Sequence, residues 1–261
     1  MEDEYRENMN KIAEKALTHT DLIVVGAEEN SKFELRGLGS SIFIRYKEAN
    51  YLLTCSHVIG NNTIFFSGAK KLHQNERLNN DPTNRQKNLT LLEREDSIDT
   101  AILSGYPEGD TAKTAYDIEK SRFLNKEIAE KNIGTLCCFV GVMGEHTQFG
   151  PWPDILYANV CYVKAMSGLG EIQNGCLTGD FAAKEIADKQ EGLFPSLTKL
   201  KEGGEINLCG CSGCGLWGID KENIFLLGML QGKNPGDPAK EHIIRFTPVW
   251  DIIALLDSKI K

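Results

Sequence analysis

Ser212 lies within the run Cys209–Trp217, where glycines stand on both sides of it and a strand-like segment follows. Glycine allows positive-φ backbone and close approach between chain segments, so a turn of this kind can aim several backbone N–H groups at one point. A serine hydroxyl attacks a carbonyl only when a base removes its proton and N–H groups stabilise the resulting oxyanion. Small residues also surround serines in ordinary tight turns. The run therefore indicates a nucleophile only if a base accompanies it.

A candidate base and a candidate acid stand upstream of this turn, each beside a strand-like segment. Segments 37–46 and 51–55 read as the two strands of a hairpin, and His57 follows the second of them. Asp99 directly precedes the apolar run 100–103, so its carboxylate is expected at the mouth of a strand. Each residue alone is more typical of a surface or turn position. Their order along the chain matches the base, the orienting acid and the nucleophile of acyl transfer.

With these residues the chain resembles the chymotrypsin-like (trypsin-fold) serine peptidases, and within them the prokaryotic HtrA-type and glutamyl-endopeptidase-like members. Leu53–Val58 is similar to the family's Thr-Ala-x-His segment, with Cys55 at the alanine position. Gly210–Leu216 is similar to its Gly-x-Ser-Gly-Gly-Pro-Leu segment, although Cys214 and Gly215 replace the Gly-Pro pair. The other matching segments are Gly39–Ile44, Asp99–Leu103, Phe139–Gly144, Ile155–Val163, Phe225–Gly232 and Phe246–Leu256. The resemblance covers roughly residues 21–259.

The resemblance implies an all-β fold of two six-stranded antiparallel β-barrels (chymotrypsin-like) with an N-terminal helix, an interlobe helix and a C-terminal helix. Apolar spacing independently predicts helices over 4–17 and 114–132. The expected domains are an N-terminal helical extension (1–20), a first barrel carrying His57 and Asp99 (21–113), an interlobe helix (114–132), a second barrel carrying Ser212 (133–247) and a C-terminal helix (248–261).

The resemblance also implies a role for each residue of the candidate site. Ser212 would be the nucleophile, His57 the general base and then the general acid, and Asp99 the residue that holds the histidine tautomer. The backbone N–H groups of Gly210 and Ser212 would form the oxyanion hole. Digestive members carry an acid before the serine, which pairs with a newly cut N-terminus, but this chain has Cys211 there. Activation by N-terminal trimming is therefore not expected.

Substrate preference stays open on this basis. The family position six residues before the serine lines the base of the specificity pocket, and here it is Ile206, which disfavours substrates with Lys or Arg. Glu205 is its neighbour, and a shift of one residue in the loop would reverse that preference. Gln231 and Gly232 end the segment that resembles the strand binding the substrate backbone. His242 would contact a substrate carboxylate, as in glutamate-selective relatives, or would be a plain surface histidine.

Composition indicates a globular protein with neither nucleic acid nor membrane as a partner. The chain has 261 residues, of which 41% are hydrophobic and 25% charged, and its net charge is -8, whereas a phosphate backbone requires a basic surface. No apolar run approaches the ~20 residues of a membrane helix. Segment 1–7 is acidic and polar, which does not fit a secretory signal. We therefore expect a cytoplasmic location, unless a leader has been removed.

The 8 cysteines divide into two groups. One group lies in apolar, strand-like context and is expected to act as buried core thiols: Cys55, Cys137, Cys138 and Cys161. The other group, Cys209, Cys211 and Cys214, has a spacing that would suit zinc or an iron–sulfur centre, with Cys176 as a distant fourth ligand. A metal there would distort the oxyanion turn, so we expect no metal and no cofactor. The alternative is a non-catalytic binding module with a metal-loaded turn.

A cytoplasmic peptidase that acts on proteins or peptides also needs restraint. Three segments are candidates for this control: the helix 4–17, the polar loop 70–88 and the insertion 167–204 with its helix-like part 180–190. The insertion directly precedes the serine turn, so we expect it to cover the cleft or to turn the Gly210 N–H away until a regulatory protein or a proteolytic cut releases it. The alternative is a constitutively active enzyme that is limited by a narrow pocket.

Overall fold

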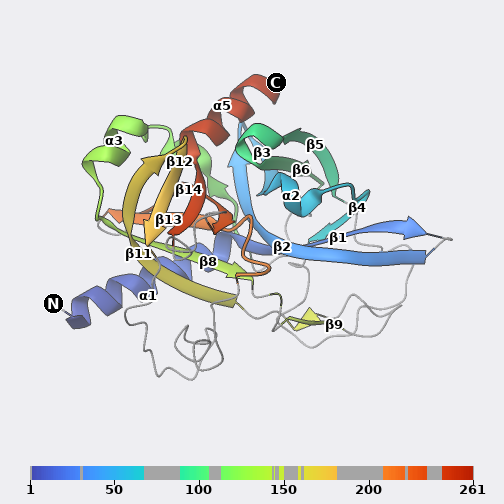
Figure 1. Cartoon of the computed structure of the whole chain (residues 1–261), viewed down its shortest axis with the longest axis horizontal. Coiled ribbons are helices and arrows are strands. Elements are labelled where there is room, and N and C mark those ends of the chain that lie inside the picture. Colours follow the sequence, from blue (N-terminus) through green and yellow to red (C-terminus); the bar gives the residue numbers. More distant parts are fainter. Residues whose placement is uncertain are drawn as a thin grey trace.

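The computed structural model of this chain is mostly β, with two antiparallel sheets side by side and a helix at each end of the chain (Figure 1). The residues that the structure describes are 2–29, 32–67, 89–105, 113–142, 144, 147–149, 158–159, 162–180, 208–220, 223–233 and 243–260. Several predicted features lie outside them, namely the loop 70–88, Cys161, Glu205, Ile206 and His242.

The first sheet contains seven strands in the described part of the chain, six of them along one antiparallel path ordered β4-β1-β2-β3-β6-β5. The seventh, β7, pairs with β2 in parallel. The strands are β1 (Thr20–Glu29), β2 (Lys32–Tyr46), β3 (Ala49–Thr54), β4 (Ile64–Ser67), β5 (Thr90–Glu95), β6 (Thr100–Ser104) and β7 (Tyr116–Asp117). Lys47 and Glu48, at φ 46° and 65°, make the two-residue turn between β2 and β3, a connection whose twist suits a hairpin.

The second sheet closes on itself in the order β11-β12-β15-β14-β13-β8. Its strands are β8 (Leu136–Val142), β11 (Tyr162–Gln173), β12 (Cys176–Asp180), β13 (Gly215–Asp220), β14 (Asn223–Lys233) and β15 (Ile243–Pro248). A separate short pair is formed by β9 (Gln148–Phe149) and β10 (Ala158–Asn159). The predicted fold of two β units is confirmed. The second sheet closes into a six-stranded antiparallel barrel as predicted, whereas the first, in the part of the chain that the structure describes, is an open sheet of seven strands and not a six-stranded barrel.

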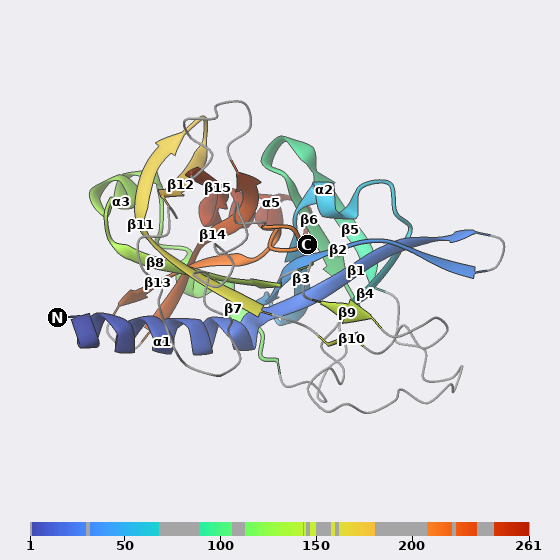
Figure 2. The ribbon, with the colours of Figure 1, turned by 60° about the horizontal axis from the view of Figure 1, so that its bottom comes forward.

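Helices lie at both ends of the chain, as predicted. α1 (Glu2–His19) lies below the second sheet in Figure 2. It contacts β8 and β13 of that sheet, and also β1 of the first sheet, which follows it in the chain. Its apolar residues Ile12, Ala13 and Ala16 are fully buried in a core that also contains residues of both sheets. α5 (Val249–Lys259) buries Val249, Ile252, Ile253, Leu255 and Leu256 in the same region. This shared core fixes the two sheets against each other.

The predicted interlobe helix is present but much shorter than the 114–132 that apolar spacing suggested. The region forms β7, a 3-10 turn η3 (Ile118–Ser121) and the helix α3 (Lys126–Lys131). Two N-caps explain the interruption: the Asp117 side chain accepts a hydrogen bond from Glu119 N, and that of Asn125 accepts one from Ile128 N. Each cap starts a new turn, so no single helix spans the region.

The prediction of an insertion over 167–204 is wrong for its first part. Residues 167–180 belong to β11 and β12, which form a hairpin of the second barrel through the turn Asn174–Gly175. Asn174 and Gly175 both have positive φ, which suits a tight hairpin turn between paired strands. The rest of that segment lies outside the described residues.

None of the helices in the described part of the chain has the length and apolar character needed to cross a lipid bilayer.

Candidate active site

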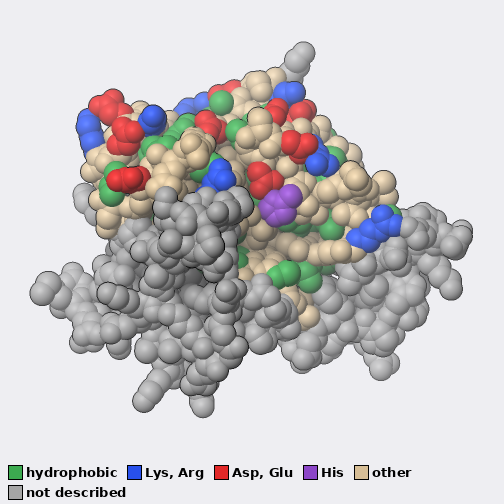
Figure 3. All heavy atoms as spheres, in the orientation of Figure 1, with side chains coloured by type: hydrophobic (Ala, Val, Ile, Leu, Met, Phe, Trp, Pro, Cys, Tyr) green, Lys and Arg blue, Asp and Glu red, His purple; other side chains and the backbone are tan. Residues whose placement is uncertain are grey.

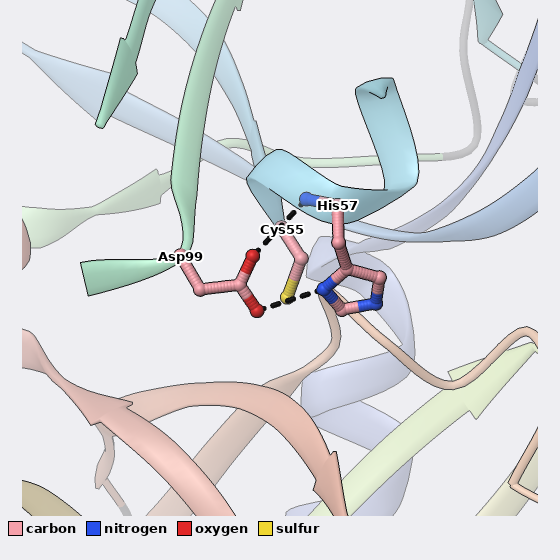
Figure 4. A group of neighbouring side chains, drawn as sticks. All are labelled: Cys55, His57 and Asp99. Carbon is pink, nitrogen blue, oxygen red and sulfur yellow. Dashed lines mark hydrogen bonds and ion pairs between the residues drawn. The ribbon is translucent and has the colours of Figure 1, made fainter. Parts of the chain in front are cut away.

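His57 and Asp99 form a hydrogen-bonded pair at the edge of the first sheet (Figure 4). His57 lies on the one-turn helix α2 (Ser56–Ile59), which begins directly after β3, and Asp99 precedes β6, the neighbour of β3. His57 Nδ1 is 2.8 Å from Asp99 Oδ2, and the backbone N–H of His57 donates to Asp99 Oδ1 at 3.1 Å. Two contacts to one carboxylate fix the orientation of the imidazole ring.

The backbone and the ionisation of Asp99 both suit this role. Asp99 ends the 3-10 turn η2 (Asp96–Ile98) in the left-handed region, at φ 49° and ψ 49°, which aspartate tolerates better than most residues. Burial of the carboxylate opposes its ionisation, but hydrogen bonds from His57 and from Ser56 Oγ (2.9 Å) outweigh this effect and lower the pKa of Asp99. Asp99 is therefore ionised at neutral pH and stabilises a proton on His57 Nδ1.

His57 remains accessible from outside the protein. Half of its side chain is exposed (50%), and Figure 3 shows a histidine side chain on the surface next to acidic side chains. Its second ring nitrogen, Nε2, has no hydrogen-bond partner among the described residues. This nitrogen is therefore open to a hydrogen-bond donor from outside, which the expected role of a general base requires.

The turn that carries Ser212 requires glycine on both sides. Gly210 and Gly213 have φ of 91° and 93°, a region that L side chains rarely adopt. A Cβ on Gly213 would lie 2.1 Å from the carbonyl oxygen of Ser40, and a Cβ on Gly210 would lie 2.6 Å from the backbone nitrogen of Gly144. Both glycines are needed because the turn packs directly against backbone from other strands.

Ser40, on β2 of the first sheet, holds this turn in place. Its backbone N–H donates to the carbonyl of Ser212 at 2.9 Å, and its hydroxyl donates to the carbonyl of Gly210 at 2.7 Å. The same hydroxyl accepts from Val142 N at 2.8 Å, and its own carbonyl accepts from Thr54 Oγ1 at 2.8 Å. Because Ser40 is fully buried, these bonds tie the serine turn of the second sheet to the strand that leads to His57.

Two backbone N–H groups of this turn are left without partners in the described part of the chain, those of Gly210 and Ser212. The neighbouring N–H groups do form hydrogen bonds: Cys211 N donates to Leu208 O at 2.9 Å, and Gly213 N donates to Leu230 O at 2.8 Å. The Cys209 carbonyl accepts from Gly144 N at 2.8 Å, and in a trans peptide the N–H of Gly210 points the opposite way. The two free donors are those expected for the oxyanion hole.

The Ser212 hydroxyl donates to the carbonyl of Gln231 at 3.2 Å and makes no hydrogen bond with His57 in this structure. The two residues nevertheless belong to one junction. The Leu230 carbonyl accepts hydrogen bonds from Cys55 Sγ at 3.0 Å and from Gly213 N at 2.8 Å. Cys55 lies two residues before His57 and Gly213 directly follows Ser212, so one carbonyl oxygen links the two segments. A hydrogen bond from Ser212 to His57 would require the serine side chain to turn away from the Gln231 carbonyl.

The end of β14 offers open backbone beside the serine. Gln231 is fixed by its side chain, whose Nε2 donates to Thr247 Oγ1 at 2.9 Å, and Thr247 in turn donates to the carbonyl of Ile98 next to Asp99. Gly232 has nothing within 4 Å of its Cβ position. The substrate-binding role of Gln231 and Gly232 stays a prediction.

Sequence reasoning missed two residues of this arrangement. Ser40 was only part of a matching motif, although its hydroxyl organises the oxyanion turn. Arg245 on β15 pairs with Gly232 in the strand register, and its guanidinium donates to Cys176 Sγ at 3.0 Å. No local pattern marks either residue, because both act across strands that are far apart in the sequence.

The cysteines behave mainly as core residues. Cys55, Cys137 and Cys138 are fully buried, as predicted, and burial raises the pKa of the Cys55 and Cys137 thiols. In the serine turn Cys211 and Cys214 are buried whereas Cys209 is exposed. Within the described ranges these three sulfurs do not converge into a group of metal ligands.

Removal of metal is therefore expected to leave the protein's activity undiminished. Because the three thiols of the serine turn do not converge in the part of the chain that the structure describes, we expect no ion to support the turn. Elemental analysis of the purified protein should find no stoichiometric zinc or iron whose binding depends on Cys209, Cys211 or Cys214, and a chelator should not lower the rate of peptide hydrolysis. One metal per chain that is lost when Cys209 and Cys214 are replaced would contradict this and would favour a metal-loaded binding module.

No family model matches this chain, and no curated protein matches it in sequence. Among solved structures it is similar to the crystal structure of the serine endoprotease from Yersinia pestis, with a TM-score of 0.56 and 16% sequence identity. The alignment covers 97% of this chain but 66% of that one, so the chain spans slightly less than two thirds of that protein's length. At this identity the similarity concerns the fold and does not distinguish the HtrA-type from the glutamyl-endopeptidase-like members. The chain has a trypsin-like fold.

Proposed function

We propose that this chain is a serine endopeptidase that cleaves protein or peptide substrates through an acyl-enzyme. The observation that carries the proposal is the pair of free N–H groups of Gly210 and Ser212 in a turn tied, through Ser40, to the hydrogen-bonded His57–Asp99 pair. A binding module would have no need for two unpaired donors around a serine hydroxyl.

In the proposed reaction the Ser212 hydroxyl turns from the Gln231 carbonyl toward Nε2 of His57. Its oxygen attacks the scissile carbonyl while Nε2 takes the proton, and Asp99 stabilises the imidazolium through Nδ1. The oxyanion accepts hydrogen bonds from Gly210 N and Ser212 N. His57 then gives the proton to the leaving amine, which departs and leaves the acyl group on Ser212. Water attacks the ester by the same steps and releases the acid and the free serine.

We further propose that the oxyanion hole is assembled in the resting protein. The carbonyls of Cys209 and Gly210 are bound by Gly144 N and Ser40 Oγ, and these two bonds oppose a flip of the peptide that would turn the Gly210 N–H away. These two hydrogen bonds favour an enzyme that is constitutively active over one in which another segment turns the Gly210 N–H away until it is released. A regulatory protein, if one acts, would then control access to the cleft.

A cytoplasmic location stays part of the proposal. None of the cysteines that the structure describes takes part in a disulfide. Cysteines without disulfides suit a reducing compartment.

The hydrogen bond from Ser212 to Gln231 favours the second candidate, a non-catalytic binding module on the same fold. In that case the hydroxyl would stay on the carbonyl and His57 would not activate it. The two candidates differ in one chemical property, the nucleophilicity of a single serine.

A fluorophosphonate probe tests this property directly. We expect the full chain to be labelled once, at Ser212, because His57 activates only that hydroxyl. Mass spectrometry of the labelled peptide locates the adduct. His57→Ala should remove the label while the protein keeps its thermal unfolding profile. A wild-type protein that stays unlabelled while a denatured sample shows the intact Ser212 peptide would support the binding module.

A further inference from the structure

Cys55 brings a third metal-binding side chain to the His57–Asp99 pair (Figure 4). Its sulfur, a ring nitrogen of His57 and a carboxylate oxygen of Asp99 all lie within 4.8 Å of one another. In the described part of the chain no other three residues of the types Cys, His, Asp and Glu come together in this way. Cys55 is fully buried, and the half-exposed imidazole of His57 gives access from solvent.

The spacing of these three atoms suits zinc. Zn²⁺ binds thiolate sulfur at about 2.3 Å, imidazole nitrogen at about 2.0–2.1 Å and carboxylate oxygen at about 2.0–2.2 Å, which places tetrahedral ligands about 3.3–3.6 Å apart. Nδ1 and Oδ2 are 2.8 Å apart, and no pair in the group exceeds 4.8 Å. Shifts of about 1 Å would therefore complete the geometry. Water would fill the fourth position from the cleft.

In the absence of metal Cys55 is a neutral thiol. Its Sγ donates to the carbonyl of Leu230 at 3.0 Å, and burial, together with the charge of Asp99, raises the pKa of the thiol. The protonated thiol leaves the His57–Asp99 hydrogen bond undisturbed. A zinc ion would replace the thiol proton, which passes to solvent, and the positive ion would compensate both the thiolate and the carboxylate.

We propose that Cys55, His57 and Asp99 form a site for thiophilic divalent cations of the zinc class, and that an ion bound there switches the active site off. The inhibitory part rests on the proposed peptidase function, whereas the binding part does not. Cys55 has no role in the proposed reaction, and the family pattern has alanine at its position.

The mechanism of inhibition follows from the two nitrogens of the imidazole. During catalysis Nδ1 carries a proton and donates it to Asp99, which leaves the lone pair of Nε2 to accept the proton of Ser212. A metal bound to Nδ1 uses the lone pair of that nitrogen, so the ring proton must lie on Nε2. An Nε2–H group cannot accept a proton. The ion therefore removes the general base and also breaks its bond with Asp99.

Inhibition of peptide hydrolysis tests the functional part. Micromolar Zn²⁺ or Cd²⁺ should inhibit the wild type reversibly, and a chelator should restore the rate. Loss of a second-shell partner alone weakens metal sites about 10- to 100-fold, so loss of the thiolate ligand in Cys55→Ala should raise the inhibitory concentration at least about tenfold. Cys209→Ser, which removes an exposed thiol near the same turn, should be inhibited like the wild type. Equal inhibition of Cys55→Ala, or loss of inhibition in Cys209→Ser, would overturn the proposal.

Cadmium absorption tests binding without any need for activity. In Ser212→Ala/Cys209→Ser protein, Cd²⁺ should produce a thiolate-to-cadmium charge-transfer band in the ultraviolet, and the band should be lost when Cys55→Ala is added. If the band depends on Cys55 but the wild type hydrolyses no peptide, the metal site stands and the peptidase function fails. If the wild type hydrolyses peptides and no band depends on Cys55, the metal site fails and the peptidase function stands.

Discussion

Ser212→Ala is expected to lower the rate of peptide hydrolysis by about 10⁴- to 10⁶-fold, and His57→Ala and Asp99→Ala should have effects of similar size. The three groups act as a unit: the hydroxyl is a poor nucleophile without the base, and the base is in the wrong tautomer without the carboxylate that it contacts at 2.8 Å. Their losses should not add, so the triple variant should be no slower than the slowest single variant by more than a small factor. Steady-state kcat/KM on a peptide pool measures this.

The matched control for Ser212→Ala is Ser258→Ala on α5, whose hydroxyl donates only to the carbonyl of Leu255 in its own helix. It should retain full activity, and all variants should unfold at temperatures close to that of the wild type, because none of the substitutions leaves a large cavity. A Ser212→Ala protein that keeps most of its activity at unchanged stability would show that another residue is the nucleophile.

Gly213→Ala is expected to destabilise the protein by about 2–5 kcal/mol, because two costs combine at this position. A non-glycine residue at φ 93° costs about 1–2 kcal/mol. The new Cβ would also lie 2.1 Å from the Ser40 carbonyl and 2.5 Å from Thr54 Oγ1, both fully buried, and relief of such overpacking costs a further 1–3 kcal/mol, roughly. Urea denaturation measures the change in the free energy of unfolding.

Gly175→Ala separates the two costs. Gly175 has φ 79° in the turn between β11 and β12, but its Cβ position has nothing within 4 Å. Gly175→Ala should therefore lower the free energy of unfolding only by the cost of the positive φ, about 1–2 kcal/mol. Equal losses for the two variants would mean that the serine turn does not pack against Ser40 as described. Any Gly213→Ala protein that folds should also be slower in hydrolysis, since the turn that aims both oxyanion donors is displaced.

The turn, the hairpin and the order of His57, Asp99 and Ser212 could be predicted from sequence because each depends on local chemistry. Glycines around a serine, apolar runs ended by turn residues and an aspartate before a strand are visible within a few residues of one another. The pairing of His57 with Asp99 also followed, since both stand at the ends of strands in one sheet. Two other predictions from local signals were wrong. The apolar spacing over 114–132 suggested one helix, but two side-chain caps interrupt it. Residues 167–180 were predicted to begin an insertion, but they form strands of the second barrel.

Sequence alone thus determined the residue types of the site, their order and the β character of the chain, because those depend on short-range preferences. Only the tertiary structure decided how they are held. Ser40 and Gly210 are 170 residues apart in the sequence, yet the hydrogen bond from the Ser40 hydroxyl to the Gly210 carbonyl holds the serine turn in place. The Ser212 hydroxyl rests on a carbonyl 19 residues away instead of on His57, and Cys55, read as a core thiol, borders the His57–Asp99 pair. Contacts between distant segments depend on how two sheets and α1 share a core, which no local pattern encodes.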